Sequence, residues 1–274
     1  MMGAGDEETD QVKGLKAFVV MGVLAVMAVA VIVPGAWLYT LGNLPNALDS
    51  ELDVETHLRQ SIESERQSVQ LSRRPSERES VKWEKPDFGK LPKNLIAFYI
   101  TETGCPTYFQ TPREDGWAWN KRVFIMLAQN RVLDGDGACE LIFARRLARR
   151  LGAQTPMQLA VAADRIHRFL EKDQLVAFDL HAMQFEHGMI GVEAASRFLM
   201  QKPLAELSVA ELAELQLAIP PWDYWEEVKR CKNASLVRES RDTLLSRLAM
   251  VGLISEEMAK TAAAQPVRCL SVRR

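Results

Sequence analysis

The chain has 274 residues, of which 47% are hydrophobic and 26% are charged, and its formal net charge is −2. This length accommodates one domain of ordinary size in addition to an anchoring segment. The near balance of positive and negative charge argues against a nucleic-acid-binding protein, which would need a strongly basic surface.

A long apolar segment lies near the N-terminus. Residues 17–41 contain no charged side chain and begin with 17 consecutive positions that are apolar or glycine, and a membrane-spanning helix needs about 20 such residues. Lys13 and Lys16 precede the segment, whereas the next basic residue after it is Arg59. This bias predicts a cytoplasmic tail at residues 1–16, a transmembrane anchor at 17–41, and the rest of the chain outside the cytoplasm. A cleaved signal peptide is the competing interpretation, but the segment is long and acidic residues precede it.

The next segment, residues 42–93, is polar and highly charged. We expect it to form a stalk. Leu58, Ile62 and Val69 hint at one apolar stripe, which predicts a helix in its first part. The charged residues around Pro75 predict a loose second part.

Residues 94–274 form the predicted globular domain, and their pattern is mainly helical. Thr155 precedes a proline and a glutamine in a capping box, Ser208 starts another, and Ser255 caps a third helix. The segment Ile96–Ile100 is the one candidate for a short strand. The fold class predicted from these patterns is mainly α.

Four cysteines are present, Cys105, Cys139, Cys231 and Cys269. Outside the cytoplasm they would meet an oxidising compartment, where disulfides persist and an even number allows full pairing. Three pairings are possible, and buried free thiols are the alternative. No cysteine or histidine spacing typical of a metal site occurs.

The most informative motif spans Glu171–Pro221. It reads EKDQLV, then DLH, then FEHGMIGVEAA, and continues as KPLAELSVAE. This order resembles the peptidoglycan glycosyltransferase domain of penicillin-binding proteins, whose pattern is close to SKDEILELYLNxVYFGHGxYGIEAAARxYFGKPxxELTLAEAALLAGLPQ. The resemblance extends over about residues 94–268. It implies a lysozyme-like, bilobal helical domain that lies against the membrane.

The resemblance also implies an activity and a location. Enzymes of this family are hexosyltransferases that join the 4-hydroxyl of one lipid-linked disaccharide to the anomeric carbon of another and release a polyprenyl pyrophosphate. The implied partners are lipid II or a glycan strand, membrane lipids and other cell-envelope proteins. The implied location is the bacterial inner (cytoplasmic) membrane, with the C-terminal domain periplasmic or extracellular. A divalent cation is implied by the resemblance alone.

The candidate general base is Glu102. The segment Ile100-Thr101-Glu102-Thr103 aligns with "AIED" in the family motif, whose glutamate takes the proton from the attacking hydroxyl. The alternative is a solvated glutamate at the end of a helix.

Several cations are candidates for substrate binding. Arg146-Leu147-Ala148-Arg149 takes the place of the family's "QLAK", and Arg145 adds a further guanidinium. Together with Lys172, these arginines could hold pyrophosphate through charge-assisted hydrogen bonds. A solvated helix face is the alternative for the arginines. His187 matches the family histidine.

Other positions are structural candidates or depart from the family. Gly188, Gly191 and Glu193 match the pattern and are expected to serve packing. The Tyr-Leu-Asn of the family is replaced by Asp179-Leu180-His181, and the second family glutamate falls near Gln158 or Leu159. These departures leave two hypotheses, a glycan polymerase and a catalytically inactive relative that acts as a scaffold or regulator. The resemblance favours the pairings Cys105–Cys139 and Cys231–Cys269.

Overall fold

The computed structural model describes residues 50–71, 85–113, 116–129, 138–185, 189–219 and 234–268, together with residues 32, 34–37, 40 and 48. The chain divides into two compact units, Met1–Leu44 and Pro45–Arg274. The predicted tail at 1–16 and most of the predicted anchor at 17–41 lie outside the described residues. Within the described ranges, no helix is both long and apolar enough to cross a membrane.

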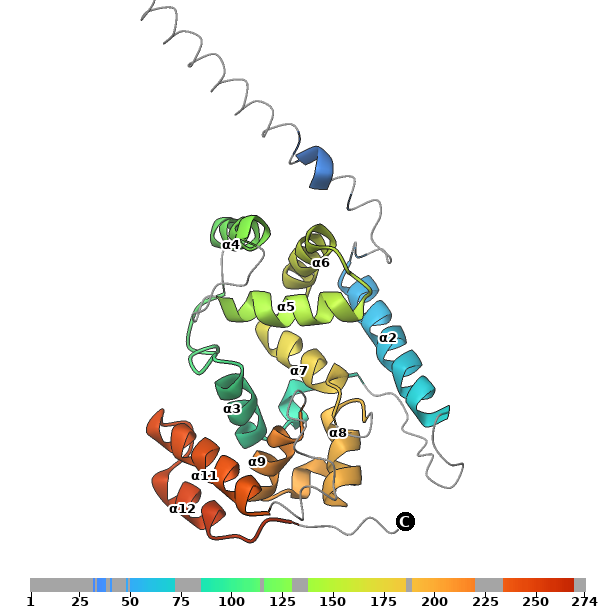
Figure 1. Ribbon diagram of the computed structural model, residues 1–274. Coiled ribbons are helices and arrows are strands. Elements are labelled where there is room, and N and C mark those ends of the chain that lie inside the picture. The colour runs from blue at the N-terminus through green and yellow to red at the C-terminus, as the bar shows by residue number, and fades with distance from the viewer. Residues whose placement is uncertain are drawn as a thin grey trace, which may run out of the picture. The chain divides into compact units, whose positions relative to one another are not determined.

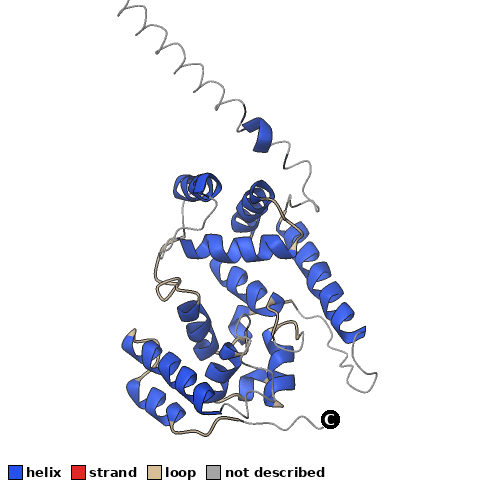
Figure 2. Cartoon of the chain, viewed as in Figure 1, coloured by secondary structure: helices blue, strands red, loops and turns tan. Residues whose placement is uncertain are grey.

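The second unit is built from helices, as Figure 2 shows. Three of them pack against α5 (Cys139–Arg150), the helix that crosses the upper half of Figure 1: α2 (Glu51–Leu71), α6 (Pro156–Phe169) and α7 (Lys172–Ala182). Helix α4 (Gly116–Gln129) packs on α6. The other elements are α3 (Lys93–Glu102), α8 (Val192–Ala195), a π-helix (Ser196–Met200), α9 (Val209–Leu217), α11 (Ala234–Met250), α12 (Glu256–Ala263) and two 3₁₀ turns (Phe88–Lys90 and Leu204–Glu206). The described residues contain no strand, only an isolated bridge between Gln184 and Ile190. This helical architecture fits a lysozyme-like helical domain.

Helix α2 falls inside the segment that we expected to be a stalk. Its helical conformation agrees with the apolar stripe, but the helix packs against α5, α6 and α7. Val54, Leu58 and Ile62, spaced four residues apart, are fully buried there because one face of a helix repeats at that spacing. The side chain of Ser61 also donates to the carbonyl oxygen of Arg150 over 2.7 Å. The first part of the expected stalk is therefore packed against the domain, and the segment around Pro75 lies outside the described residues.

Helix α3 corrects the strand prediction. Ile96–Ile100 lies within Lys93–Glu102, and every residue of α3 from Leu95 to Thr101 is buried. A helix that is covered on all sides gives a continuous apolar run, which periodicity alone does not distinguish from a buried strand. The contacts of α3 with α9 and α11 supply that cover.

The three predicted helix starts are confirmed. The Thr155 side chain accepts from the backbone N–H of Gln158, whose own side chain accepts from the backbone of Thr155. Ser208 and Glu211 form the same reciprocal arrangement at α9. Ser255 accepts from the third backbone N–H that follows it. Each cap satisfies donors that the first turn of a helix leaves unpaired.

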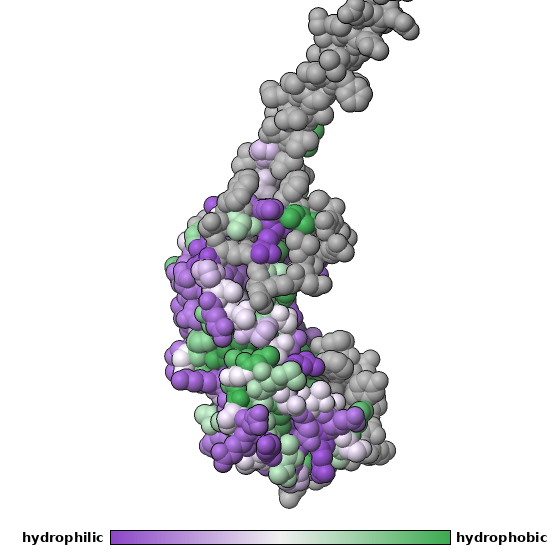
Figure 3. Space-filling view, turned by 90° about the vertical axis from the view of Figure 1, so that its left-hand side faces the viewer, coloured by the Kyte–Doolittle hydropathy of each residue, from purple (hydrophilic) through white to green (hydrophobic). Residues whose placement is uncertain are grey.

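The surface drawn in Figure 3 is mainly hydrophilic, with hydrophobic residues gathered in a band across the middle of that face.

Candidate functional site

A pocket of about 660 Å³ lies where α3, α5, α7 and α9 meet, and we call it the Glu102 pocket. The charged and hydroxyl-bearing residues of its lining come from α3, α5 and α7, and from Thr103, which follows α3. They are Tyr99, Glu102, Thr103, Arg146, Arg149, Arg150 and Asp179. The rest of the lining is Met183, Gln184, Gln216, Leu217 and Ile219. The pocket therefore joins two carboxylates and three guanidinium groups beside an apolar patch.

Glu102 is the last residue of α3. Its Oε1 accepts a hydrogen bond from Nη1 of Arg247 on α11 over 2.8 Å. The next residue, Thr103, closes the helix by donating from its hydroxyl to the carbonyl oxygen of Tyr99. The structure thus places the candidate base in a pocket, with its carboxylate oriented by an arginine that the sequence did not single out.

Arg146, Tyr99 and Asp179 form a polar cluster in the wall of the pocket. Nη1 of Arg146 donates to the Tyr99 hydroxyl over 2.8 Å and to Oδ2 of Asp179 over 3.3 Å, and the Tyr99 hydroxyl donates to the same Oδ2. Burial raises the pKa of Asp179, although Arg146 acts in the opposite direction. Burial, followed by the charge of Asp179, raises the pKa of the Tyr99 hydroxyl well above its usual value. Tyr99 therefore stays protonated and remains a donor.

The other candidate arginines of α5 differ in position. Arg149 is exposed and lines the Glu102 pocket. Arg150 also lines it and is paired with Glu65 of α2. Arg145 does not line the pocket, and its pKa is lowered, first by burial and then by the neighbouring charge of Arg149. The pocket brings Arg146 and Arg149 together with Glu102, but it does not include Arg145.

Lys172 lies at a different place from the one we expected. Its Nζ donates to the carbonyl oxygens of Tyr108 and Thr111, the latter over 2.8 Å, and lies 3.5 Å from Oε1 of Glu140. These contacts attach the loop after α3 to the start of α7, and Lys172 is absent from the lining of the Glu102 pocket. Its expected role in phosphate binding finds no support in this position, because its three hydrogens are directed to protein oxygens.

A second buried polar cluster lies at the N-terminus of α5 and was not predicted. Glu140 accepts from Nε2 of His167 over 2.6 Å, and Trp119 stacks on the His167 ring with centroids 3.7 Å apart. Burial raises the pKa of Glu140, but His167, Lys172 and Arg113 outweigh burial and lower it overall. The only sign of this cluster in the sequence was Glu140, a charged residue in the otherwise apolar first turn of α5.

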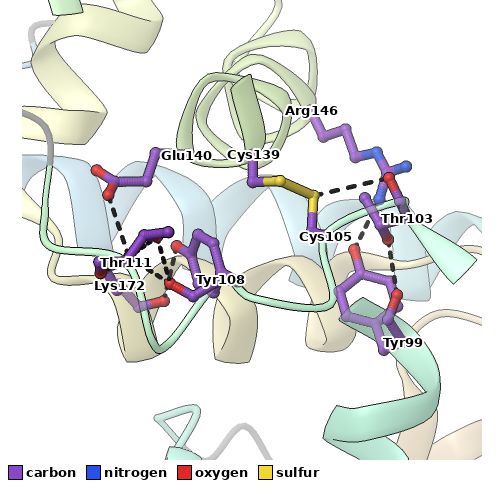
Figure 4. The surroundings of a disulfide bond; sticks show 9 residues. All are labelled: Tyr99, Thr103, Cys105, Tyr108, Thr111, Cys139, Glu140, Arg146 and Lys172. Carbon is purple, nitrogen blue, oxygen red and sulfur yellow. Dashed lines mark hydrogen bonds and ion pairs between the residues drawn. A yellow bond between two sulfur atoms is a disulfide. The ribbon is translucent and has the colours of Figure 1, made fainter. Parts of the chain in front are cut away.

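A disulfide joins Cys105 and Cys139, with their Cα atoms 5.9 Å apart. It ties the loop that follows Glu102 to the first residue of α5. In Figure 4 the disulfide lies between Tyr99 and Arg146 on one side and Glu140 and Lys172 on the other. This is the pairing that the resemblance favoured for these two cysteines, whereas Cys231 and Cys269 lie outside the described residues.

The glycine motif is only partly described. Gly191 has a φ of +89°, and a Cβ atom there would lie 2.7 Å from the carbonyl oxygen of His181. Its N–H donates to the carbonyl oxygen of Met183 over 2.8 Å, so the close backbone packing requires glycine. Glu193 is half-buried in α8. His187 and Gly188 lie outside the described residues.

Comparison with known proteins finds partial similarity to two kinds of cell-wall protein. No family model matches the chain. The chain is 36% identical to Penicillin-binding protein 1F of Bacillus subtilis (strain 168) over 104 residues, which are 37% of this chain and 14% of that protein. It is 27% identical over 182 residues to Penicillin-binding protein 1A of Rickettsia conorii, covering 65% of this chain and 22% of the relative. A Biosynthetic peptidoglycan transglycosylase of Neisseria meningitidis serogroup C is 29% identical over 83 residues, 30% of this chain and 34% of the relative.

These partial similarities support a divergent transglycosylase domain in this chain. The match spans less than a quarter of the two penicillin-binding proteins and about a third of the transglycosylase. The chain differs from the transglycosylase pattern at the second glutamate. Gln158, near that position, uses its side chain to cap α6 and does not line the Glu102 pocket.

Two residues of the pocket lining, Tyr99 and Asp179, were not predicted as site residues. Asp179 appeared in the sequence as a departure from the family pattern within an apolar stretch, without an assigned role. Tyr99 belonged to the apolar run of α3 that we interpreted as a short strand. Their pairing depends on packing between helices 80 residues apart.

Proposed function

We propose that the protein is a membrane-anchored peptidoglycan glycosyltransferase that binds lipid II in the Glu102 pocket and polymerises glycan strands. The observation that carries the proposal is the position of Glu102, which matches the family's general base and lies in one pocket with Arg146 and Arg149. The similarity to a transglycosylase and to penicillin-binding proteins supports the reaction class.

The proposed reaction assigns roles to three side chains that line the pocket and to Arg247 beside Glu102. Glu102 takes the proton from the attacking 4-hydroxyl while that oxygen forms a bond to the anomeric carbon of the donor sugar. The bond from the anomeric carbon to pyrophosphate breaks, and the leaving group carries away the electron pair. Arg146 and Arg149 stabilise the negative charge that develops on pyrophosphate. Arg247 orients Glu102 by holding Oε1, and Oε2 receives the proton.

The resemblance also implies a divalent cation, and the residues of the pocket do not fit one. Both carboxylates that line it are already paired, Glu102 with Arg247 and Asp179 with Arg146. Across the described parts of the chain, no group of three His, Cys, Asp or Glu side chains is placed to hold a metal ion. The proposed mechanism therefore assigns charge neutralisation to arginines.

One observation favours the second candidate function, a catalytically inactive relative that acts as a scaffold or regulator in a cell-envelope complex. The family places a second glutamate near Gln158, and the Gln158 side chain is engaged in a helix cap. Such a protein would keep the Glu102 pocket and bind lipid II or a glycan strand without turnover. The anchor proposed at residues 17–41 would hold either form at the inner membrane, beside membrane lipids and other envelope proteins.

A polymerisation assay with labelled lipid II and full-length protein in detergent tests the proposal. We expect glycan chains from the unchanged protein and a loss of about 100-fold or more in rate for Glu102→Gln, since a positioned general base contributes about 10²–10⁴-fold. Glu206→Gln, the same change at an exposed residue of a 3₁₀ turn, is the matched control and should leave the rate unchanged. Absence of polymer with retained lipid II binding would favour the scaffold, and absence of both would reject the proposal.

A further inference from the structure

The Arg146 guanidinium is bound to the protein through one of its three nitrogens. Nη1 carries the hydrogen bonds to Tyr99 and Asp179. Within the described parts of the chain, no hydrogen bond involves Nε or Nη2 of Arg146. The side chain of Arg146 is 41% exposed, whereas that of Asp179 is 7% exposed. Arg146 therefore lines the pocket with two nitrogens, Nε and Nη2, that make no hydrogen bond to the described residues. Asp179, which holds the third nitrogen, is buried.

Three helices hold Arg146 in this position. Tyr99 comes from α3, Arg146 from α5 and Asp179 from α7. The guanidinium carbon also lies 6.0 Å from the ring centroids of both Tyr99 and Phe143, which restricts its rotation. Without Asp179, the cation would lose the only carboxylate that pairs with it in the described residues.

The free edge has the geometry of an oxyanion receptor. Nε and Nη2 of an arginine present two parallel N–H groups that match two oxygens of a phosphate or carboxylate. Arg149 lies one turn further along α5, is exposed, and has no carboxylate partner in the described ranges. Besides Arg150, which is paired with Glu65, the pocket is thus lined by one cation in a fixed orientation and one without a carboxylate partner in the described residues.

Both members of the ion pair stand where the chain departs from the family pattern. Arg146 falls on the glutamine of "QLAK", and Asp179 falls on the tyrosine of "YLN". The structure places these two departures in contact across 3.3 Å. Asp179 without Arg146 would be a buried charge without its cation, whereas the two together give a paired and oriented cation.

We propose that Arg146 forms an oxyanion subsite for a phosphate group in the Glu102 pocket, and that Asp179 and Tyr99 are positioning residues that direct its Nε–Nη2 edge. The subsite itself stands on the geometry of the three side chains. The assignment of the phosphate to the diphosphate of a lipid-linked substrate rests on the proposed function, and free inorganic phosphate is the other source of the same chemistry.

Calorimetric binding of inorganic pyrophosphate to the full-length protein tests the subsite independently of turnover. We expect Arg146→Gln to weaken binding about tenfold or more, the loss of about 1.4 kcal/mol or more. Asp179→Asn should weaken it about three- to tenfold, and Tyr99→Phe about threefold, because Nη1 keeps one of its two acceptors. The control Arg238→Gln, the same change at an exposed position of α11, should change affinity less than about twofold.

The double variant Arg146→Gln/Asp179→Asn separates positioning from general damage to the fold. If Asp179 acts through Arg146, the double variant should bind pyrophosphate as weakly as Arg146→Gln alone. If the two residues act independently, the losses of binding free energy in the two single variants should add up in the double variant. Equal affinity of Arg146→Gln and the unchanged protein would overturn the subsite, and additive losses would overturn the positioning role. Arg146→Lys keeps the charge without the two-pronged edge, so it should bind less tightly than the unchanged protein.

A parallel titration with lipid II assigns the source of the phosphate. Loss of lipid II binding in Arg146→Gln, in step with pyrophosphate, supports the lipid-linked diphosphate. Loss of pyrophosphate binding alone supports free phosphate and contradicts the lipid assignment. If the protein does not polymerise lipid II, a weakened pyrophosphate affinity of Arg146→Gln still establishes the subsite.

Discussion

The buried pair of Arg241 and Glu214 allows a stability prediction with a defined size. The two side chains are 0% and 1% exposed, and Nη1 of Arg241 lies 3.1 Å from Oε1 of Glu214. Nη2 also donates to the carbonyl oxygen of Ala263 over 2.9 Å. One side chain on α11 thereby connects α9 and the end of α12.

Arg241→Met removes the cation and leaves the Glu214 carboxylate buried. The backbone N–H of Arg268, 3.2 Å from Oε2, remains as a donor and offsets part of the loss. Breaking a buried pair on one side costs about 3–5 kcal/mol because the remaining charge loses its oppositely charged partner. For a unit of this size, about 2–4 °C per kcal/mol gives a fall in Tm of about 10 °C.

Urea unfolding of Arg241→Met, Glu214→Leu and the double variant would measure the coupling. We expect the double variant to lose less stability than the sum of the single variants, because no lone charge is buried in it. Arg238→Met, at an exposed position of the same helix, should stay within about 0.5 kcal/mol of the unchanged protein. A cost below about 1 kcal/mol for Arg241→Met, or strictly additive losses, would refute the reasoning.

Three further predictions concern the supports of the fold. Burial raises the pKa of Glu211, but hydrogen bonds from a lysine, a backbone N–H and an arginine outweigh it and bring the pKa to about 2, below the usual 4.5. Its contribution to stability is therefore present above pH 4.5 and is lost as the pH falls through 2. Glu211→Gln should cost about 1–2 kcal/mol at pH 7 after allowance for solvent screening, and much less at pH 2. An equal cost at both pH values in urea unfolding would contradict this. Replacing Cys105 and Cys139 together by serine opens a loop of 34 residues and should lower the unfolding free energy by about 3–4 kcal/mol, and an unchanged urea midpoint would reject that role. Gly191→Ala should cost about 2 kcal/mol or more because of its positive φ and the nearby His181 carbonyl, as judged by its Tm against that of Gly35→Ala, where a Cβ meets nothing within 4 Å.

The local features of the fold were predictable where the hydrogen-bonding partners lie close together in the sequence. The caps at Thr155, Ser208 and Ser255 depend on residues within one turn, and all three form as predicted. The segment Ile96–Ile100 was wrong as a strand because its burial comes from other helices. The packing of α2 on the domain was missed for the same reason, because the helices that cover its apolar stripe lie elsewhere in the sequence.

The candidate site was predictable only in part. Glu102, Arg146 and Arg149 lie in one pocket, as a shared role requires. Lys172 does not, because its neighbours in space are carbonyl oxygens of a loop that is 61 or more residues away in sequence. Asp179 is significant only through contacts with α3 and α5, and no local pattern reports such contacts.

The most direct test of the central claim is the release of polyprenyl pyrophosphate from lipid II, measured together with the glycan formed by the full-length protein. A transglycosylase with Glu102 as its base releases one pyrophosphate carrier for each glycosidic bond, and the Glu102→Gln variant releases almost none. Release at the same rate from the unchanged protein and from Glu102→Gln, or no release above that of lipid II alone, would contradict the account.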